Sequence, residues 1–108
     1  MKIKLSPIRM DEQLTASVDG DKISINGEVF DFTPLQEGAI IPADAVQSDW
    51  IVGDVCRILG EIHLTLRLPH GMNAPHETRF PAAYYEPMTV VDGPVLLPPY
   101  DAAPEVML

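Results

Sequence analysis

Three histidines are the residues most able to do chemistry in this chain of 108 residues. His70 and His76 lie in the stretch LPHGMNAPHETRFP (68–81), and His63 precedes it. A zinc site needs three or four converging ligands, and spacings such as H-x-H or H-x3-H place two of them on one face of a strand or helix. The three histidines show neither spacing. The pattern therefore predicts no metal site and no cofactor, and solvated histidines account for it.

Cys56 offers a second kind of chemistry, as a nucleophile that His63 would activate. A catalytic cysteine also needs an oxyanion hole and a third group that orients the histidine. The sequence indicates neither, and a single cysteine in an apolar strand usually behaves as a small hydrophobic side chain. The sixteen carboxylates are spread along the chain, which favours turns and a solvated surface over an acid and base pair. We therefore predict no catalytic residues.

The composition limits the partners that the chain could bind. The formal net charge is −9, and the seven lysines and arginines are scattered. Nucleic acids and anionic membranes attract clustered basic side chains, so we expect neither as a partner. No apolar run reaches the length of a membrane span, and the first residues lack the apolar core of a secretory signal. A single cysteine can form no internal disulfide, and we expect a cytoplasmic protein.

Two hairpin dipeptides, Asp19-Gly20 and Asn26-Gly27, divide residues 13–32 into three predicted strands. The opposed pairs are then Ile25–Glu28, Ser24–Val29 and Ile23–Phe30 for the second turn, and Ala16–Ile23 and Leu14–Ile25 for the first. Because opposed residues share a face of the sheet, both turns predict the same two faces. The apolar face consists of Leu14, Ala16, Val18, Ile23, Ile25 and Phe30. The polar face consists of Thr15, Ser17, Lys22, Ser24 and Asp31.

A second hairpin is predicted over residues 50–69, with Leu59-Gly60 as its loop. This register opposes Cys56 to His63 and Val55 to Leu64. The second strand alternates between an apolar face (Ile62, Leu64, Leu66, Leu68) and a polar face (Glu61, His63, Thr65, Arg67). The expected fold is mainly β, a small antiparallel sheet or meander of two hairpin units. The pattern leaves open whether the units form one sheet, a sandwich or a small barrel.

Proline-rich segments separate and follow the hairpins. Residues 33–49 are typical of a long connection, in which Pro42 could open a helical turn over ADAVQ. From Pro81 onward the chain holds six prolines and no lysine or arginine. Ordering a backbone residue costs about 1–2 kcal/mol, and the last ten residues offer little burial to offset that cost. We therefore expect a β domain over residues 1–80. Residues 81–108 would form an acidic segment that is partly extended or disordered and frays after about Pro98.

The combination of NGEVFDFTPLQEGA, GEIHLTLRLPHGMNAPHETRFP and a Pro-rich acidic tail resembles small hypothetical proteins of prophage tail and tail-fibre gene regions. These motifs span most of the chain. The resemblance implies a setting rather than an activity, and it carries over no catalytic residues. It implies a phage or prophage product in the cytoplasm of the bacterial host or in the virion.

We therefore expect a non-enzymatic structural or tail-assembly accessory protein that binds other protein chains. Exposed strand edges could pair with a partner or with a second copy, which makes a homo-oligomer compatible with the pattern. Partner contacts are expected at Tyr84 and Tyr85, and at His70 and His76. Two alternatives stay open, namely a small acidic inhibitor of a host enzyme and a metal-dependent enzyme that uses the histidine-containing loop.

Overall fold

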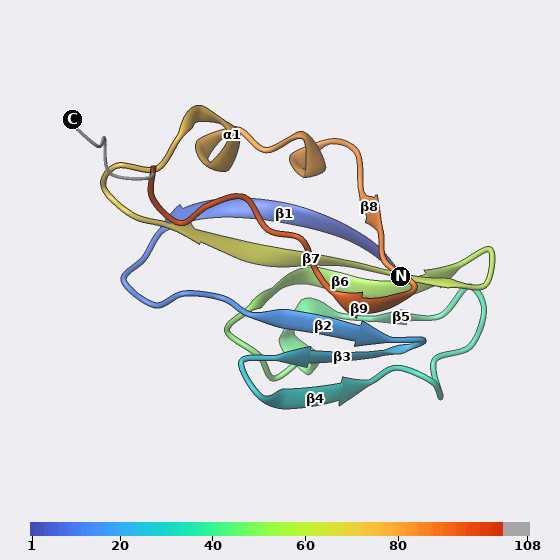
Figure 1. The fold of residues 1–108 in the computed structure, drawn as a ribbon. Helices are drawn as coiled ribbons and strands as arrows, with labels where there is room; N and C mark the ends of the chain where they lie inside the picture. The colour runs from blue at the N-terminus through green and yellow to red at the C-terminus, as the bar shows by residue number, and fades with distance from the viewer. Residues whose placement is uncertain (103–108) are drawn as a thin grey trace, which may run out of the picture.

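Two β-sheets form the body of the protein (Figure 1). The computed structural model describes residues 1–102. One sheet has five strands in the order β5-β6-β7-β1-β8, and the other has four strands in the order β4-β3-β2-β9. The strands are β1 Lys2–Arg9, β2 Ala16–Asp19, β3 Lys22–Ile25, β4 Glu28–Asp31, β5 Ile40–Ile41, β6 Ile51–Ile58, β7 Glu61–His70, β8 Met88–Thr89 and β9 Asp92–Pro94. The protein is mainly β, as the sequence predicts, and residues 1–102 form no closed barrel.

The antiparallel meander β2-β3-β4 confirms the expected division into faces. The turn at Asn26-Gly27 has the predicted register, with Ile25 opposite Glu28. The first turn differs, because its loop is Gly20-Asp21 and Ala16 therefore lies opposite Ile25. Gly20 has a φ of +60°, and glycine with a positive φ at the first loop position is typical of a type II′ turn. Since the register moves by two residues, each side chain keeps its predicted face.

The hairpin of β6 and β7 confirms Leu59-Gly60 as its loop and Cys56 as the partner of His63. Its far half departs from the prediction, because the register shifts between Val52 and Cys56. The expected pair of Val55 and Leu64 is therefore absent from this ladder. The shift is a β-bulge that contains Gly53 at a φ of +74°, a conformation that glycine adopts without a Cβ penalty.

The position of β1 differs from the expected architecture. It lies between β7 and β8, and it pairs with β7 in parallel. The five-stranded sheet is therefore mixed, whereas the sequence predicts a small antiparallel sheet of two hairpin units and does not predict this parallel pair. The residues of β1 alternate between exposed or half-buried Lys2 and Lys4 and buried Ile3 and Leu5. That alternation is a strand signal, but a parallel partner distant in sequence is not set by any turn.

The hydrophobic core lies between the two sheets. It takes the inward side chains of both, including Ile3, Leu5, Leu14, Ala16, Val18, Ile23, Ile25, Ile62, Leu64, Leu66 and Leu68. Burying one such isoleucine or leucine stabilises the fold by about 1.5–3 kcal/mol. Phe30 packs against this core while partly exposed. The predicted apolar faces of both hairpins are therefore the faces that the fold buries.

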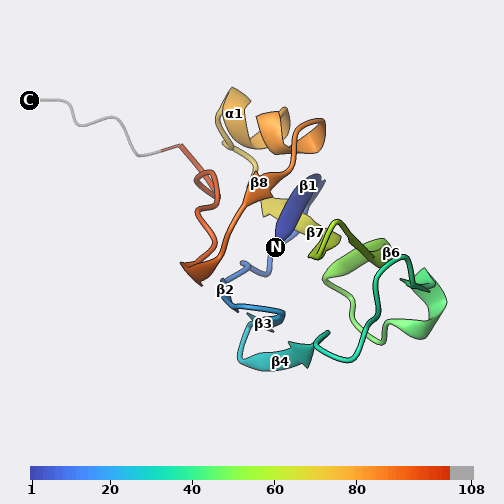
Figure 2. The ribbon, with the colours of Figure 1, turned by 90° about the vertical axis from the view of Figure 1, so that its right-hand side faces the viewer.

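Short helical turns occupy the connections. Pro42 precedes the 3-10 turn η1 Ala43–Ala45, which confirms the predicted helical turn. The helix α1 His76–Arg79 and the 3-10 turn η2 Ala82–Tyr84 lie beyond the edge of the five-stranded sheet near β1 and β8 (Figure 2). No helix among residues 1–102 is long and apolar enough to cross a membrane.

The chain after Pro81 joins both sheets, because β8 pairs with β1 and β9 pairs with β2. Residues 99–102, where fraying is expected, include two that form hydrogen bonds with the loop after β7. Gly71 donates its N–H to the carbonyl oxygen of Tyr100 at 2.8 Å, and Ala102 donates to Asn73 at 2.8 Å. The remainder of that prediction concerns residues 103–108, which lie outside the described residues.

Candidate functional site

The three histidines occupy separate positions in the fold and have different neighbours. His63 is the third residue of β7, and His70 is its last residue. The Nδ1 atom of His70 lies 3.1 Å from the carbonyl oxygen of Gly71. His76 begins α1, and its ring centroid lies 4.9 Å from that of Phe80. Within residues 1–102, no three His, Cys, Asp or Glu side chains come together in a way that could hold a metal ion.

Cys56 and His63 are neighbours on the outer face of the five-stranded sheet, and Lys2 of β1 lies on the other side of His63. These residues border a cavity of about 200 Å³. Among residues 1–102, no hydrogen bond joins the Cys56 thiol to the His63 ring. Asp54 also lines this cavity, but its carboxylate accepts the N–H of Ala43 at 2.9 Å, and among residues 1–102 no hydrogen bond joins it to the His63 ring. The arrangement therefore lacks the orienting third member of a nucleophilic triad.

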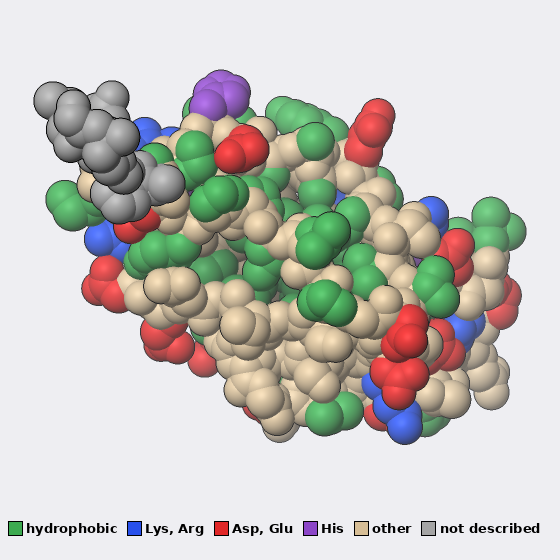
Figure 3. All heavy atoms as spheres, viewed as in Figure 1, with side chains coloured by type: hydrophobic (Ala, Val, Ile, Leu, Met, Phe, Trp, Pro, Cys, Tyr) green, Lys and Arg blue, Asp and Glu red, His purple; other side chains and the backbone are tan. Residues whose placement is uncertain are grey.

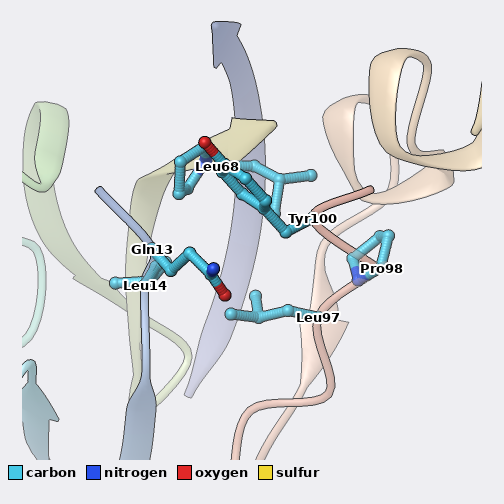
Figure 4. A pocket seen from close by; sticks show the side chains of 7 residues that line it. Gln13, Leu14, Leu68, Leu97, Pro98 and Tyr100 are labelled. Carbon is cyan, nitrogen blue, oxygen red and sulfur yellow. The ribbon is translucent and has the colours of Figure 1, made fainter. Parts of the chain in front are cut away.

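The cavity that adjoins the core is small. It lies between the two sheets, where the segment after β9 crosses their edges, and Figure 4 shows Leu14, Leu68, Leu97 and Tyr100 around it. The Tyr100 hydroxyl donates a hydrogen bond to the carbonyl oxygen of Met10. The volume of this cavity, about 90 Å³, is well below the roughly 300–1,000 Å³ of typical small-molecule pockets. This cavity therefore suits packing of the C-terminal segment better than ligand binding.

A cluster of exposed aromatic side chains lies on α1, η2 and the residues that follow them. Phe80 is 69% exposed, Tyr84 50% and Tyr85 79%. The rings of Tyr84 and Tyr85 meet edge to face, with their centroids 4.9 Å apart. Together with Pro7, Arg79 and Pro81, these aromatic residues line a cavity of about 290 Å³. We call these six residues the aromatic surface.

Buried neighbours fix the backbone that presents the aromatic surface. Thr78 is fully buried, and its hydroxyl donates to the carbonyl oxygen of Pro99 at 2.6 Å. Ala83 is buried in the core cluster. The Arg79 guanidinium donates to the carbonyl oxygen of Met72 at 2.9 Å. Alternation of buried and exposed residues along α1 and η2 therefore holds the aromatic rings outward on an anchored backbone.

The sequence-predicted partner residues are brought together only in part. Tyr84 and Tyr85 lie side by side, and His76 packs against Phe80, which adjoins them. His70 is half-buried at the end of β7 and does not line the cavity. The sequence reasoning missed Phe80 and Arg79. Their position in TRFP, directly before a proline-rich segment, was the available signal.

Comparison of this chain with protein-family models, with curated proteins and with solved structures found no match. The assignment of a function therefore depends on the chain's own residues and surfaces. Figure 3 shows hydrophobic side chains across the middle of one face, with acidic side chains toward its two ends. That face includes no concentration of basic side chains comparable to the acidic ones.

Proposed function

We propose that this chain is a non-enzymatic structural or assembly-accessory protein of a phage or prophage tail or tail-fibre region, and that it binds another protein chain. The observation that supports this proposal is the aromatic surface, in which Phe80, Tyr84 and Tyr85 are exposed beside Arg79. The setting is inferred from the resemblance of the chain to prophage tail-region proteins. On this proposal the protein acts in the bacterial cytoplasm or in the virion.

The residue types of the aromatic surface are those on which protein partners most often depend. Tyrosine, phenylalanine and arginine are enriched in interfaces, and tyrosine and arginine dominate binding hot spots. A tyrosine has only two side-chain torsions, so fixing it on binding costs little entropy for the area it buries. The rings of Tyr84 and Tyr85 already pack edge to face, with their centroids 4.9 Å apart. This contact reduces further the freedom that would be lost.

The chemistry of the surface indicates what the partner would offer. Apolar rings and the prolines Pro7 and Pro81 favour an apolar side chain inserted into the cavity. The Arg79 guanidinium uses one nitrogen on the Met72 carbonyl, and it has further donors for a carbonyl or a carboxylate. We therefore expect a tail or fibre protein that presents an apolar residue next to an acidic one.

Affinity capture with co-expressed tail and tail-fibre proteins tests this proposal. The variant Tyr84→Ala/Tyr85→Ala should bind the captured tail protein roughly tenfold or more weakly, because hot-spot truncations cost upwards of about 2 kcal/mol. The matched control is Val91→Ala/Leu96→Ala, which removes two side chains exposed by 71% and 80% outside the aromatic surface. A tail protein that binds both variants equally, or the capture of no tail protein, would contradict the proposal.

Charge favours a second candidate function, a small acidic inhibitor of a host enzyme. The formal net charge of −9 suits a chain that competes for a basic active site. Such binding should collapse between low and high salt, since exposed charges are screened over about 8 Å at physiological ionic strength. Binding through the aromatic surface should persist in high salt. Capture of a host nuclease or polymerase in a salt-sensitive complex would favour the inhibitor.

A further inference from the structure

The outer edge of β4 has no strand beside it in the part of the chain that the structure describes. β4 pairs with β3 in an antiparallel ladder, and the N–H of Phe32 continues that side by donating to the carbonyl oxygen of Asp21 at 3.0 Å. Alternate residues of an antiparallel strand bond to the same neighbour. The N–H and C=O groups of Val29 and Asp31 therefore point away from β3, toward the open edge.

A groove of about 370 Å³ adjoins this edge. It lies where β4 faces β5 and η1, at the side of the two sheets away from β9 and β8. Its apolar lining consists of Val29, Phe30, Phe32, Ile41, Ala45 and Val46. Val29 is 62% exposed. An extended chain paired with β4 would place alternate side chains against this lining.

The charges around the groove are acidic. Glu28 is exposed and belongs to the lining, and Asp44 is exposed in η1. Neither carboxylate forms a salt bridge with another residue of 1–102. Asp31 lies opposite Lys22 in the ladder. No lysine or arginine lines the groove, so a basic side chain of a partner would meet Glu28 and Asp44 without a competing cation.

We propose that the edge of β4 is a docking site for an extended segment of another protein, in which apolar residues and a lysine or arginine stand two positions apart and so share the face that meets the groove. The segment would add a fifth strand next to β4. Its main-chain groups would bond to those of Val29 and Asp31. Glu28 and Phe30 share the face of β4 that meets the groove. The apolar side chain of the segment would fill the groove, and its basic side chain on the same face would reach Glu28 and Asp44.

A second copy of this chain is a poorer occupant of the same edge. Pairing of β4 with β4 of another copy would bring Glu28 and Asp31 of both chains into one short ladder. Like charges in a cross-strand arrangement destabilise a sheet, and charged side chains on an edge strand discourage self-pairing. The charge pattern therefore selects a basic partner over a homodimer at this edge.

This site goes beyond the proposed function because it is separate from the aromatic surface. Figures 1 and 2 both place β4 on the opposite side of the molecule from α1. The two surfaces could therefore be occupied at the same time. The chain would then join two protein partners of different chemistry, one held by aromatic contacts and one by strand addition.

The variant Val29→Pro tests the strand addition. Proline removes the N–H that points to the open edge and leaves the ladder to β3 in place, since edge strands tolerate proline on that side. The probe is a synthetic hexapeptide in which every second residue is threonine and the residues between them are valine, lysine and valine, so that valine and lysine share one face. Val29→Pro should weaken its binding roughly tenfold, whereas the control Val29→Thr, which keeps the N–H, should change it by less than about twofold. Equal binding to the two variants would overturn the proposal.

Two further measurements keep the test decisive. Circular dichroism and thermal unfolding must show that Val29→Pro folds, and Glu28→Lys supplies a variant with an intact backbone that should also weaken binding of the valine–lysine peptide. The same hexapeptide with glutamate in place of lysine should bind the unaltered protein and Val29→Pro weakly, and it should bind Glu28→Lys more tightly because that variant reverses the charge. Equal binding of the acidic and basic peptides, or dimerisation of the free protein that Val29→Pro abolishes, would overturn the assignment of a basic partner. Tyr84→Ala/Tyr85→Ala should bind the basic peptide unchanged, which separates failure of this site from failure of the aromatic surface.

Discussion

The Arg57 guanidinium donates a hydrogen bond to the Asp21 carboxylate at 2.9 Å and so joins the two sheets. Arg57 lies in β6, and Asp21 lies in the turn between β2 and β3. The same guanidinium donates to the carbonyl oxygens of Leu35, Phe32 and Gly60. One side chain therefore ties together both sheets and the connection between β4 and β5.

Replacing Arg57 should destabilise the fold strongly. The Arg57 side chain is 12% exposed and that of Asp21 is 33% exposed, and hydrogen bonds to charged groups contribute about 1.5–3 kcal/mol each. We expect Arg57→Ala to lower the free energy of unfolding in urea by about 3 kcal/mol. The control is Arg9→Ala, because the Arg9 side chain is 46% exposed and its partner Asp11 93%. Equal losses in the two variants would contradict the bridging role of Arg57.

The turn at Leu59 offers a stabilising substitution. Leu59 has a φ of +51° and is 90% exposed. The left-handed region costs most residues about 1–2 kcal/mol, and asparagine tolerates it better. We expect Leu59→Asn to raise the free energy of unfolding by about 1 kcal/mol, since Asn-Gly is the preferred pair for this turn. Leu59→Ala keeps the Cβ penalty and should give no such gain, and a gain of the same size from alanine would refute the explanation.

The buried hydroxyl of Thr78 should hold the C-terminal segment against α1. Thr78→Val keeps the shape but leaves the Pro99 carbonyl without its 2.6 Å donor. Pro99 is exposed, so water can replace the lost donor, and a hydrogen bond of this kind contributes about 0.5–1.5 kcal/mol. We expect a loss of stability of that size and faster hydrogen exchange at the N–H of Gly71, which donates to Tyr100. Thr78→Ser retains the hydroxyl and should lose less. If serine and valine are equally destabilising, the hydrogen bond is not the cause.

The pKa of the Asp31 carboxyl group should depend on Thr33. The Thr33 hydroxyl and then its N–H donate to the Asp31 carboxylate and hold the pKa of Asp31 below its ordinary value. A carboxyl group with a lowered folded-state pKa contributes stability that is present above its unfolded pKa and lost as the pH falls through its folded pKa. Thr33→Val should therefore raise the pKa of Asp31 in an NMR titration. An unchanged titration curve would contradict this cause.

Local signals explain the parts of the fold that the sequence predicts well. Asn26-Gly27 and Leu59-Gly60 set their registers through a two-residue loop, and no distant contact is needed. β1 could be recognised by its alternation but not placed, because nothing near it in the chain specifies the parallel pairing with β7. The bulge at Gly53 also escaped prediction, since a single glycine within a strand does not show how many residues it inserts.

Only part of the candidate site could likewise be predicted from the sequence. Tyr84 and Tyr85 are adjacent in sequence, so their pairing required no knowledge of the fold. Phe80 and Pro7 join them only because α1 and η2 pack beside β1. The hydrogen bonds of Tyr100 and Ala102 could not be predicted, because their partners Gly71 and Asn73 come from a distant loop. Long-range contacts, rather than local propensity, decide these features.

Side-chain oxidation by hydroxyl radicals, measured on the chain with and without a bound tail or tail-fibre protein, tests the central claim most directly. Aromatic side chains react readily when exposed, and Phe80 and Tyr85 are 69% and 79% exposed in the free chain. The account predicts that both become protected in the complex, while Leu59, which is 90% exposed at the tip of the β6–β7 hairpin, reacts unchanged. Unaltered oxidation of Phe80 and Tyr85 in a formed complex would contradict binding through the aromatic surface.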